Sequence, residues 1–310
     1  MNQLVKISKL SKSFGNFSAV SNISFDLQKG EVLGFLGPNG AGKTTTMRML
    51  TGFLKPTEGE IYINNVNLQK NPVLCRKYIG YVPEGSPLYN EMNTIDFLKF
   101  IADVRNIGKD CVEEALNKVI RLLSLNSILF QKIDTLSKGY KRRIGLAQSI
   151  IHNPDVLILD EPTDGLDPNQ KNEVRKLIKK LGKEKAIIIS THILEEVNAI
   201  CNRAMIIANG KLLLDEKPKD ILKKSDNFNS IFISVEEMKS EELKKNILDL
   251  KISDNVKIIN NYCVIKIDRS KSFKKKLDTY IKHKNLTLKH YSMGQGSLEE
   301  VFRRLTTNEK

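Results

Sequence analysis

Short apolar runs and helical periodicities alternate along the first two thirds of the chain. Val32–Leu36 is an apolar run that ends in a glycine-rich turn, and residues 44–54 then have helical spacing. A turn at 56–59 leads into an alternating strand at 60–64. This succession through residues 1–220 predicts an α/β domain with a largely parallel sheet.

A helical stretch interrupts that pattern at 93–130. Apolar residues from Ile95 to Ala102 follow helical spacing behind a cap at Asn93, and those at 115–123 do the same. Because the stretch lies between sheet segments, we expect it to form a helical subdomain that covers about 85–150.

The character of the sequence changes after Asp215. Pro218 and the polar stretch 223–230 predict a linker. Residues 231–235 and 264–267 then alternate in the manner of half-buried strands.

Helical patterns follow in the same C-terminal region. Residues 271–284 predict a basic, exposed helix, and Ser297 with Glu300 fits a capping box before a helix at 301–305. We therefore predict that 226–310 forms a small α+β appendage.

Composition agrees with two folded domains and argues against a membrane span. The chain has 310 residues, of which 40% are hydrophobic, and no apolar run approaches the ~18 residues that a span requires. Residues 1–10 lack the apolar core of a signal peptide. The expectation is a soluble protein of the cytoplasmic type.

The net charge of +14 comes mainly from lysine and is spread over both halves of the chain. A dispersed excess favours a solvated basic surface over a nucleic-acid groove, so we expect no specific nucleic-acid partner. Four scattered cysteines without a Cys-x-x-Cys pair argue against a zinc site or a disulfide framework.

A phosphate-binding loop is the strongest local motif. The pattern G-x-x-x-x-G-K-[ST] follows a predicted strand and precedes a predicted helix. Glycines let successive backbone N–H groups face a polyphosphate, the lysine neutralises it, and the threonine hydroxyl binds Mg²⁺. A glycine turn with a coincidental lysine is the disfavoured alternative. The expected nucleotide contacts are Gly37, Pro38, Asn39, Gly40, Ala41, Gly42, Lys43, Thr44 and the adjacent Thr45.

Two carboxylates follow the apolar run 156–159. We expect Asp160 to hold a metal through water, and Glu161 to orient or deprotonate the water that attacks the γ-phosphate. An Asp-Glu pair is usually a surface acidic patch. Behind an apolar strand and together with a phosphate loop, it predicts a nucleotide hydrolase.

A third motif identifies the branch of hydrolases. Leu136-Ser137-Lys138-Gly139-Tyr140 precedes a predicted helix, upstream of the acidic strand. With Gly165-Leu166-Asp167 and His192 it resembles the ATP-binding cassette family, the ATPase subunits of ABC transporters. The resemblance spans about residues 3–215, with the motifs in the family's order. It implies the P-loop NTPase fold of the ABC nucleotide-binding domain, with ATP and Mg²⁺ as cofactors.

The resemblance assigns further roles. Phe14 matches the aromatic that stacks on adenine, although a buried core phenylalanine is an alternative. Ser137 and Gly139 match the loop that caps the γ-phosphate held by a second copy, and Ser137 is a good helix cap. Asp167 matches the loop that links the two active sites, and His192 matches the histidine that contacts the γ-phosphate. A lone histidine is more often structural.

Three positions, in two motifs, depart from the common family pattern. Lys138 and Tyr140 stand where glycine and glutamine are commonest, and Glu84 follows Pro83 where glutamine is usual. Glu84 can still accept a metal-bound water and touch the membrane subunit. It cannot donate the hydrogen bonds of an amide.

Several runs look like the type-2 exporter branch of the family, which includes drug, sodium and antibiotic exporters. Among them, Pro83-Glu84, the run at 87–92 and Asp167-Pro168-Asn169-Gln170 are most similar to gliding-motility-associated ATPase subunits of Bacteroidetes. The terminal run at 296–302 also fits the exporter branch.

The family arrangement implies that one chain holds only half of each active site. Two copies meet head-to-tail and bury two ATP molecules between Lys43 and Glu161 of one copy and Ser137 and Gly139 of the other. The helical subdomain passes the movement to a multi-span membrane permease. This places the chain in the cytoplasm, peripheral on the inner face of the cell membrane.

Three other functions compete with this one, and features of the sequence disfavour each of them. A non-transport cassette ATPase acting on ribosomes or DNA carries long coiled coils or two cassettes in one chain, and neither pattern occurs. A P-loop GTPase needs an Asn-Lys-x-Asp motif, which is missing from the sequence. A binding module has no need for Glu161 beside Asp160.

Overall fold

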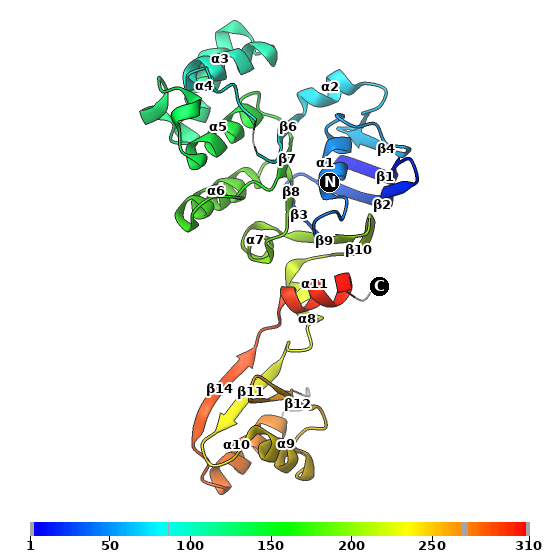
Figure 1. The fold of residues 1–310 in the computed structure, drawn as a ribbon, viewed down its shortest axis with the longest axis vertical. Helices are drawn as coiled ribbons and strands as arrows, with labels where there is room; N and C mark the ends of the chain where they lie inside the picture. The colour runs from blue at the N-terminus through cyan, green and yellow to red at the C-terminus, as the bar shows by residue number, and fades with distance from the viewer. Residues whose placement is uncertain (1–2, 86, 268–271, 308–310) are drawn as a thin grey trace. The chain divides into compact units, whose positions relative to one another are not determined.

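The chain folds into two compact units, Met1–Pro218 and Lys219–Lys310. The computed structural model describes residues 3–85, 87–267 and 272–307 (Figure 1). The boundary between the units lies in helix α8 (Pro218–Lys223), a few residues before the polar stretch from which we predicted a linker.

A six-stranded sheet forms the centre of the first unit. All neighbouring strands are parallel except one pair at the edge of the sheet, β10 and β9, which is antiparallel. In sheet order the strands are β10 (Lys211–Glu216), β9 (Arg203–Ala208), β3 (Val32–Leu36), β8 (Ala186–Thr191), β7 (Val156–Asp160) and β6 (Ile79–Val82). This is the parallel sheet that the apolar runs predict.

A second sheet in this unit is antiparallel, which corrects the expectation of one largely parallel sheet for 1–220. Its order is β2 (Phe17–Gln28), β1 (Gln3–Phe14), β4 (Glu58–Ile63) and β5 (Val66–Asn67). Register shifts interrupt the pairing of β1 with β2, including one between Ile7 and Leu10. Because each shift breaks the two-residue alternation, these long strands leave a weak pattern in the sequence.

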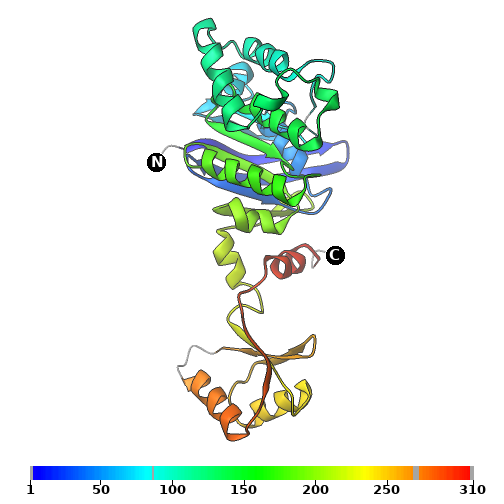
Figure 2. The ribbon, with the colours of Figure 1, turned by 90° about the vertical axis from the view of Figure 1, so that its left-hand side faces the viewer.

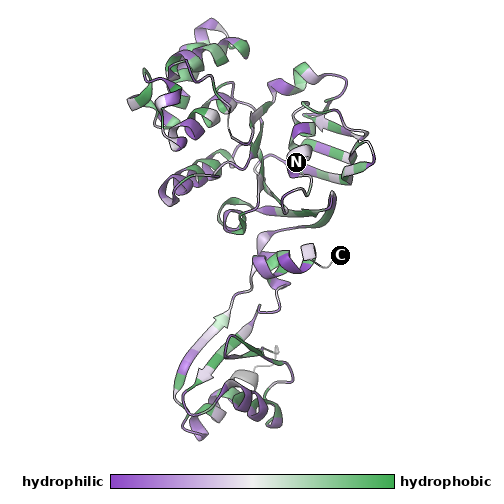
Figure 3. Cartoon of the chain, in the orientation of Figure 1, coloured by the Kyte–Doolittle hydropathy of each residue, from purple (hydrophilic) through white to green (hydrophobic). Residues whose placement is uncertain are grey.

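Two apolar cores lie on opposite faces of the central sheet. Successive residues of β7 alternate between them, so Leu157 packs with the helices whereas Ile158 packs toward the antiparallel sheet. Figure 3 shows these central strands as predominantly apolar. Residues of α6 (Pro168–Leu181) belong to the first core, and residues of α1 (Lys43–Leu50) belong to the second.

Helix α1 is shorter than the segment 44–54 from which we predicted it. Thr51 is its C-cap, and Gly52 follows with a φ of 72°. A left-handed glycine at this point ends the helix, so the apolar residues beyond it belong to a turn.

Along the chain the helical subdomain comes between β6 and β7, and Figure 2 shows its helices gathered together at one side of the first unit. Its helices are α3 (Thr94–Val104), α4 (Lys109–Leu122) and α5 (Lys138–Ile150), with 3₁₀ turns at Asn126–Ile128 and Ile133–Thr135. The predicted cap is confirmed, since the side chain of Asn93 accepts a hydrogen bond from the Asp96 N–H at 2.9 Å.

The second unit is an α+β fold of the β-α-β-β-α-β type. Its antiparallel sheet packs against both helices through Ile231, Ile233, Leu243 and Leu277. The elements are β11 (Ser230–Val235), α9 (Ser240–Asp249), β12 (Val256–Ile259), β13 (Tyr262–Lys266), α10 (Ser272–His283) and β14 (Leu288–Gly294), in the sheet order β12-β13-β11-β14. Residue 271, the predicted helix start, lies outside the described residues.

The stretch 223–230 is more ordered than a linker, which corrects that expectation. Ser225 is only 1% exposed, and its hydroxyl donates a hydrogen bond of 2.7 Å to Glu300. Glu300 also accepts from the Asp226 N–H at 2.6 Å. The predicted capping box of α11 (Leu298–Thr307) is therefore half formed: Ser297 accepts from the Glu300 N–H, but the Glu300 carboxylate is engaged by 225–226.

None of the helices within the described ranges is long and apolar enough to cross a lipid bilayer.

Candidate active site

Four adjacent strands deliver the predicted site residues to one edge of the central sheet. The phosphate loop follows β3, Glu84 follows β6, Asp160 and Glu161 stand at the end of β7, and His192 follows β8. These strands are parallel neighbours, so their carboxyl ends meet where open α/β sheets bind ligands.

Glycine is required at two positions of the phosphate loop. A Cβ on Gly37 would lie 2.5 Å from the Ile207 carbonyl oxygen. Gly42 has a φ of 101°, and its Cβ would lie 2.5 Å from the Ala19 carbonyl oxygen. The loop thus packs closely against neighbouring backbone, and α1 starts directly after it at Lys43.

Lys43 is the basic centre of the site. Its side chain is 7% exposed, and its Nζ donates hydrogen bonds to the carbonyls of Gly37 at 2.8 Å and Pro38 at 3.2 Å. Burial lowers the pKa of this lysine. Three carboxylates act in the opposite direction, in decreasing order those of Glu161, Asp160 and Glu84. The structure therefore brings together acidic residues that are far apart in the sequence.

Asp160 is 1% exposed and only half satisfied. Its Oδ1 accepts a hydrogen bond from the Ser190 hydroxyl, whereas the buried Oδ2 has no partner within the described chain. An unpartnered buried carboxylate oxygen fits a metal-bound water. No group of three His, Cys, Asp or Glu that could hold a metal ion occurs among the described residues. Mg²⁺ bound to nucleotide phosphates needs few protein ligands.

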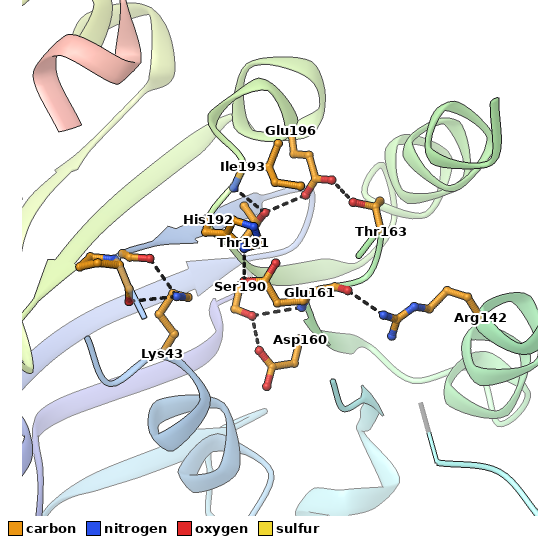
Figure 4. Close-up of polar contacts among 12 residues, drawn as sticks. Lys43, Arg142, Asp160, Glu161, Thr163, Ser190, Thr191, His192, Ile193 and Glu196 are labelled. Carbon is orange, nitrogen blue, oxygen red and sulfur yellow. Dashed lines mark hydrogen bonds and ion pairs between the residues drawn. The ribbon is translucent and has the colours of Figure 1, made fainter. Parts of the chain in front are cut away.

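Glu161 has a constrained backbone and a partnered carboxylate (Figure 4). Its φ is 48°, a left-handed value that is uncommon for a residue with a Cβ. Its N–H donates to the Ser190 carbonyl at 3.1 Å, and its carbonyl accepts from Arg142 Nη2 at 2.9 Å. Its Oε1 lies 3.0 Å from His192 Nδ1. The backbone contacts hold the carboxylate toward the histidine.

Ser137 and Gly139, in the motif Leu136–Tyr140, have contacts of a different kind. Ser137 is exposed and caps α5, with its hydroxyl accepting from the Tyr140 N–H at 3.4 Å. Gly139 is buried against Gln170 of α6, whose side chain a Cβ would approach to 2.6 Å. None of these contacts involves the phosphate loop.

Two further predicted residues have defined places. Phe14 is 51% exposed, so the alternative of a buried core residue is wrong, and Lys12 Nζ lies 5.1 Å from its ring centroid. Asp167 is the N-cap of α6, because its carboxylate accepts from the N–H groups of Asn169 and Gln170, each at 2.9 Å.

Sequence reasoning missed the polar residues that support this site. Ser190 bonds both Asp160 and the Glu161 backbone, Arg142 bonds the Glu161 carbonyl, and Glu196 bonds Thr163 and Thr191. One signal was available. Glu196 lies on the first helical turn after His192, among the apolar residues Ile193, Leu194 and Val197. It occupies a position where an apolar residue is expected.

Comparisons with known proteins place these residues in a family context. The family model described as "ABC transporter" matches residues 20–164. The "Uncharacterized ABC transporter ATP-binding protein YhcH" of Bacillus subtilis (strain 168) is 36% identical over 245 residues, which are 76% of this chain and 77% of that protein. The "Bacitracin transport ATP-binding protein BcrA" of Bacillus licheniformis is 33% identical over 307 residues, 98% of each chain.

A solved structure of a related protein has a similar fold. The structure of an ATP-binding subunit of an ABC transporter superposes with a TM-score of 0.66 at 28% identity. The match covers 71% of this chain and 92% of that one.

Proposed function

This chain belongs to the family of ABC transporter ATP-binding proteins, and from that premise we propose which residues carry its ATPase activity and how two copies share them. It binds and hydrolyses ATP as a transporter subunit. The single observation that carries the residue assignment is the convergence of Lys43, Asp160 and Glu161, with His192 held 3.0 Å from Glu161.

Glu161 orients the attacking water and accepts its proton. The water oxygen forms a bond to the γ-phosphorus, the bond to the β–γ bridging oxygen breaks, and ADP leaves with the electron pair. Lys43 exchanges its contacts with Gly37 and Pro38 for the β- and γ-phosphates, while His192 contacts the γ-phosphate. The other phosphate-loop residues and Thr45 bind the triphosphate through backbone N–H groups and hydroxyls, except Pro38, which has no N–H and contributes to the shape of the loop.

Three residues are available to hold Mg²⁺ beside the phosphates: the Thr44 hydroxyl, Asp160 and Glu84. The unpartnered Oδ2 of Asp160 supports this assignment. Mg²⁺ held there would neutralise charge on the phosphate oxygens. Ser190 keeps the Asp160 carboxylate in place for that role.

The site is completed by a second copy of the chain. Ser137 is exposed at the N-terminus of a 13-residue helix and makes no contact with its own phosphate loop. We infer that Ser137 and Gly139 cap the γ-phosphate bound to the partner copy, head-to-tail, with Asp167 and its loop between the two sites. Closure requires ATP because the nucleotide supplies contacts that exist only in the dimer.

The Glu161→Gln variant tests this arrangement. It retains ATP but loses the base, so the purified variant is expected to become a dimer in light scattering when ATP and Mg²⁺ are added. The Lys43→Ala/Glu161→Gln double variant is the matched control and stays monomeric, because it binds ATP weakly. A Glu161→Gln chain that stays monomeric at saturating ATP contradicts the proposal.

A large groove in the first unit supports docking of a membrane permease. The groove has a volume of about 2130 Å³ and contains exposed apolar side chains from the turn after α1, from α2 (Pro72–Lys77) and from the helical subdomain. The most exposed are Phe53 at 75%, Val73 at 70%, Tyr89 at 59% and Val104 at 58%. Exposed patches of this kind mark protein contacts. Through such a partner the chain acts at the inner face of the cell membrane.

Export is the direction that the exporter-type motifs support, and the relative named for bacitracin transport agrees with an antibiotic-type system. The runs at 83–84, 87–92 and 167–170 further favour the gliding-motility-associated branch. Affinity purification from the native membrane tests the transporter assignment, and deletion of the gene tests the narrower branch. Recovery with a multi-span permease supports the transporter assignment, whereas recovery with ribosomes or DNA contradicts it. Gliding that persists after the gene is deleted contradicts the narrower branch.

A further inference from the structure

A buried glutamate lies behind the site and has no role in the scheme above. Glu196, on α7 (Leu194–Ile200), is 1% exposed. Thr163 donates a hydrogen bond to its Oε1, Thr191 donates to its Oε2 at 2.9 Å, and Arg175 Nη2 lies 3.9 Å from Oε1. Burial raises the pKa of this carboxyl. A buried carboxyl is costly, and here both of its oxygens are used.

The two threonines belong to the two loops that carry the proposed catalytic groups. Thr191 directly precedes His192, and its hydroxyl also accepts from the Ile193 N–H at 3.0 Å, which fixes the turn on both sides of the histidine. Thr163 lies two residues after Glu161, in a turn where the Asp164 N–H donates to the Glu161 carbonyl at 3.2 Å.

These contacts close a ring. Glu161 is hydrogen-bonded to His192, and the backbone leads from His192 to its neighbour Thr191. Thr191 and Thr163 both donate to Glu196, and the backbone leads from Thr163 back to Glu161 (Figure 4). In this ring only Glu196 projects from a helix, whereas the others lie in loops or at a strand end. A rigid element thus sets the spacing of two loops.

We propose that Glu196 is a positioning residue for ATP hydrolysis, which ties the loop of Glu161 to the loop of His192 and keeps both aimed at the γ-phosphate. The inference rests on the roles proposed above for Glu161 and His192. It also extends to the loop that runs on to Asp167, since Thr163 anchors the start of that loop. Glu196 is 1% exposed and both of its oxygens are engaged by threonines, so its loss is expected to act on turnover and to leave nucleotide binding intact.

The test compares Glu196→Leu with Glu196→Gln in the full-length chain. Leucine keeps the size and removes both acceptors, and a displacement of about 1 Å at a catalytic group lowers kcat about 100-fold. The KM for ATP and the dissociation constant for a fluorescent ATP analogue are expected to stay within about twofold of wild type. Glutamine can bond both threonine hydroxyls and is expected to restore kcat to within about fivefold.

Glu195 supplies the matched control, since it is exposed on the same helix turn. Glu195→Gln is expected to leave kcat unchanged. If Glu196→Leu fails to fold, Thr163→Val and Thr191→Val carry the test, each lowering kcat with nucleotide affinity preserved. Their effects are expected to be non-additive in the double variant, because both act through one carboxyl.

The outcomes are distinguishable. A Glu196→Leu chain that folds and keeps a kcat within twofold of wild type overturns the inference, as does an equal loss of rate and affinity. Valine variants with wild-type kcat overturn it as well. A wild-type chain without ATP turnover, or a Glu161→Gln variant with undiminished turnover, refutes the proposed function instead.

Discussion

Two glycines of the phosphate loop offer a matched test of how the loop is built. Gly40 has a φ of 80° and Gly42 a φ of 101°, so alanine at either position must adopt a left-handed backbone. The positions differ in their surroundings. A Cβ at Gly40 meets nothing within 4 Å, whereas a Cβ at Gly42 would lie 2.5 Å from the Ala19 carbonyl oxygen.

The difference in surroundings sets the expected magnitudes. Gly40→Ala has only the conformational cost, about 1–2 kcal/mol in the free energy of unfolding. Gly42→Ala adds the displacement of a backbone carbonyl in a packed region, which overpacking data put at about 1–3 kcal/mol. We therefore expect Gly42→Ala to lower the free energy of unfolding by about 2–5 kcal/mol.

Urea unfolding of the full-length chain without nucleotide measures both values directly. The free energy of unfolding should rank wild type above Gly40→Ala, and Gly40→Ala above Gly42→Ala. Two variants that agree within about 0.5 kcal/mol would refute the reasoning, because the contact with Ala19 would then have no energetic consequence.

Three further substitutions test other parts of the structure. Phe14→Ala should weaken ATP binding about 5- to 150-fold, the equivalent of about 1–3 kcal/mol for one stacked base. The free energy of unfolding should change little, because the ring is 51% exposed. A titration with a fluorescent nucleotide measures the affinity, and an unchanged affinity contradicts the prediction. Burial lowers the pKa of His152 from 6.5 to about 4. As the pH falls, the unfolded chain therefore binds a proton at this histidine before the folded chain does. The contribution of the neutral imidazole to the free energy of unfolding is complete above pH 6.5 and is lost as the pH falls toward 4. His152→Gln keeps a donor for the Ile79 carbonyl and should flatten that part of the stability–pH curve; an unchanged curve argues against the buried neutral imidazole. Arg203→Lys replaces two hydrogen bonds of 2.7 Å to Asp215 with a single point charge. It should lower the free energy of unfolding, measured by urea titration, by about 1–3 kcal/mol. A loss below about 0.5 kcal/mol would contradict a stabilising role for the two paired hydrogen bonds.

The central sheet was predictable because its strands are buried on both faces. Val32–Leu36 and Val156–Asp160 are buried at every position, and the apolar runs in the sequence coincide with these strands. The antiparallel sheet was not predictable in the same way. Its long first strand pairs on both sides with interrupted register, so apolar and polar positions drift between its faces.

Helix caps could also be predicted from the sequence, since a cap depends on residues about three positions apart. The sequence predicts caps at Asn93 and Ser137, and each side chain accepts a hydrogen bond from the first turn of the helix that it precedes. Glu300 shows where local reasoning ends. Its sequence neighbourhood indicates a capping box, but Ser225 and Asp226, distant in sequence, engage its carboxylate.

The supporting residues of the site were hidden for the same reason. Motif spacing located Lys43, Asp160 and Glu161 because each follows a recognisable strand. Nothing in the spacing shows that Glu196 bonds two loops, since Thr163 lies 33 positions before it. Side chains that orient other side chains depend on tertiary contacts, and the sequence pattern records only their unusual burial.

The claim that two chains build each ATP site is tested most directly by mixing two inactive variants. Lys43→Ala lacks a working phosphate loop, and Ser137→Arg blocks the start of α5, so neither homodimer holds a complete site. In a mixed dimer one site combines the intact loop of one chain with the intact helix start of the other. The account predicts that mixing restores ATPase activity to at most about half of the wild-type value, since only mixed dimers close on ATP and each has one complete site of two. A mixture no more active than its two components, or a Ser137→Arg chain with wild-type turnover on its own, would contradict it.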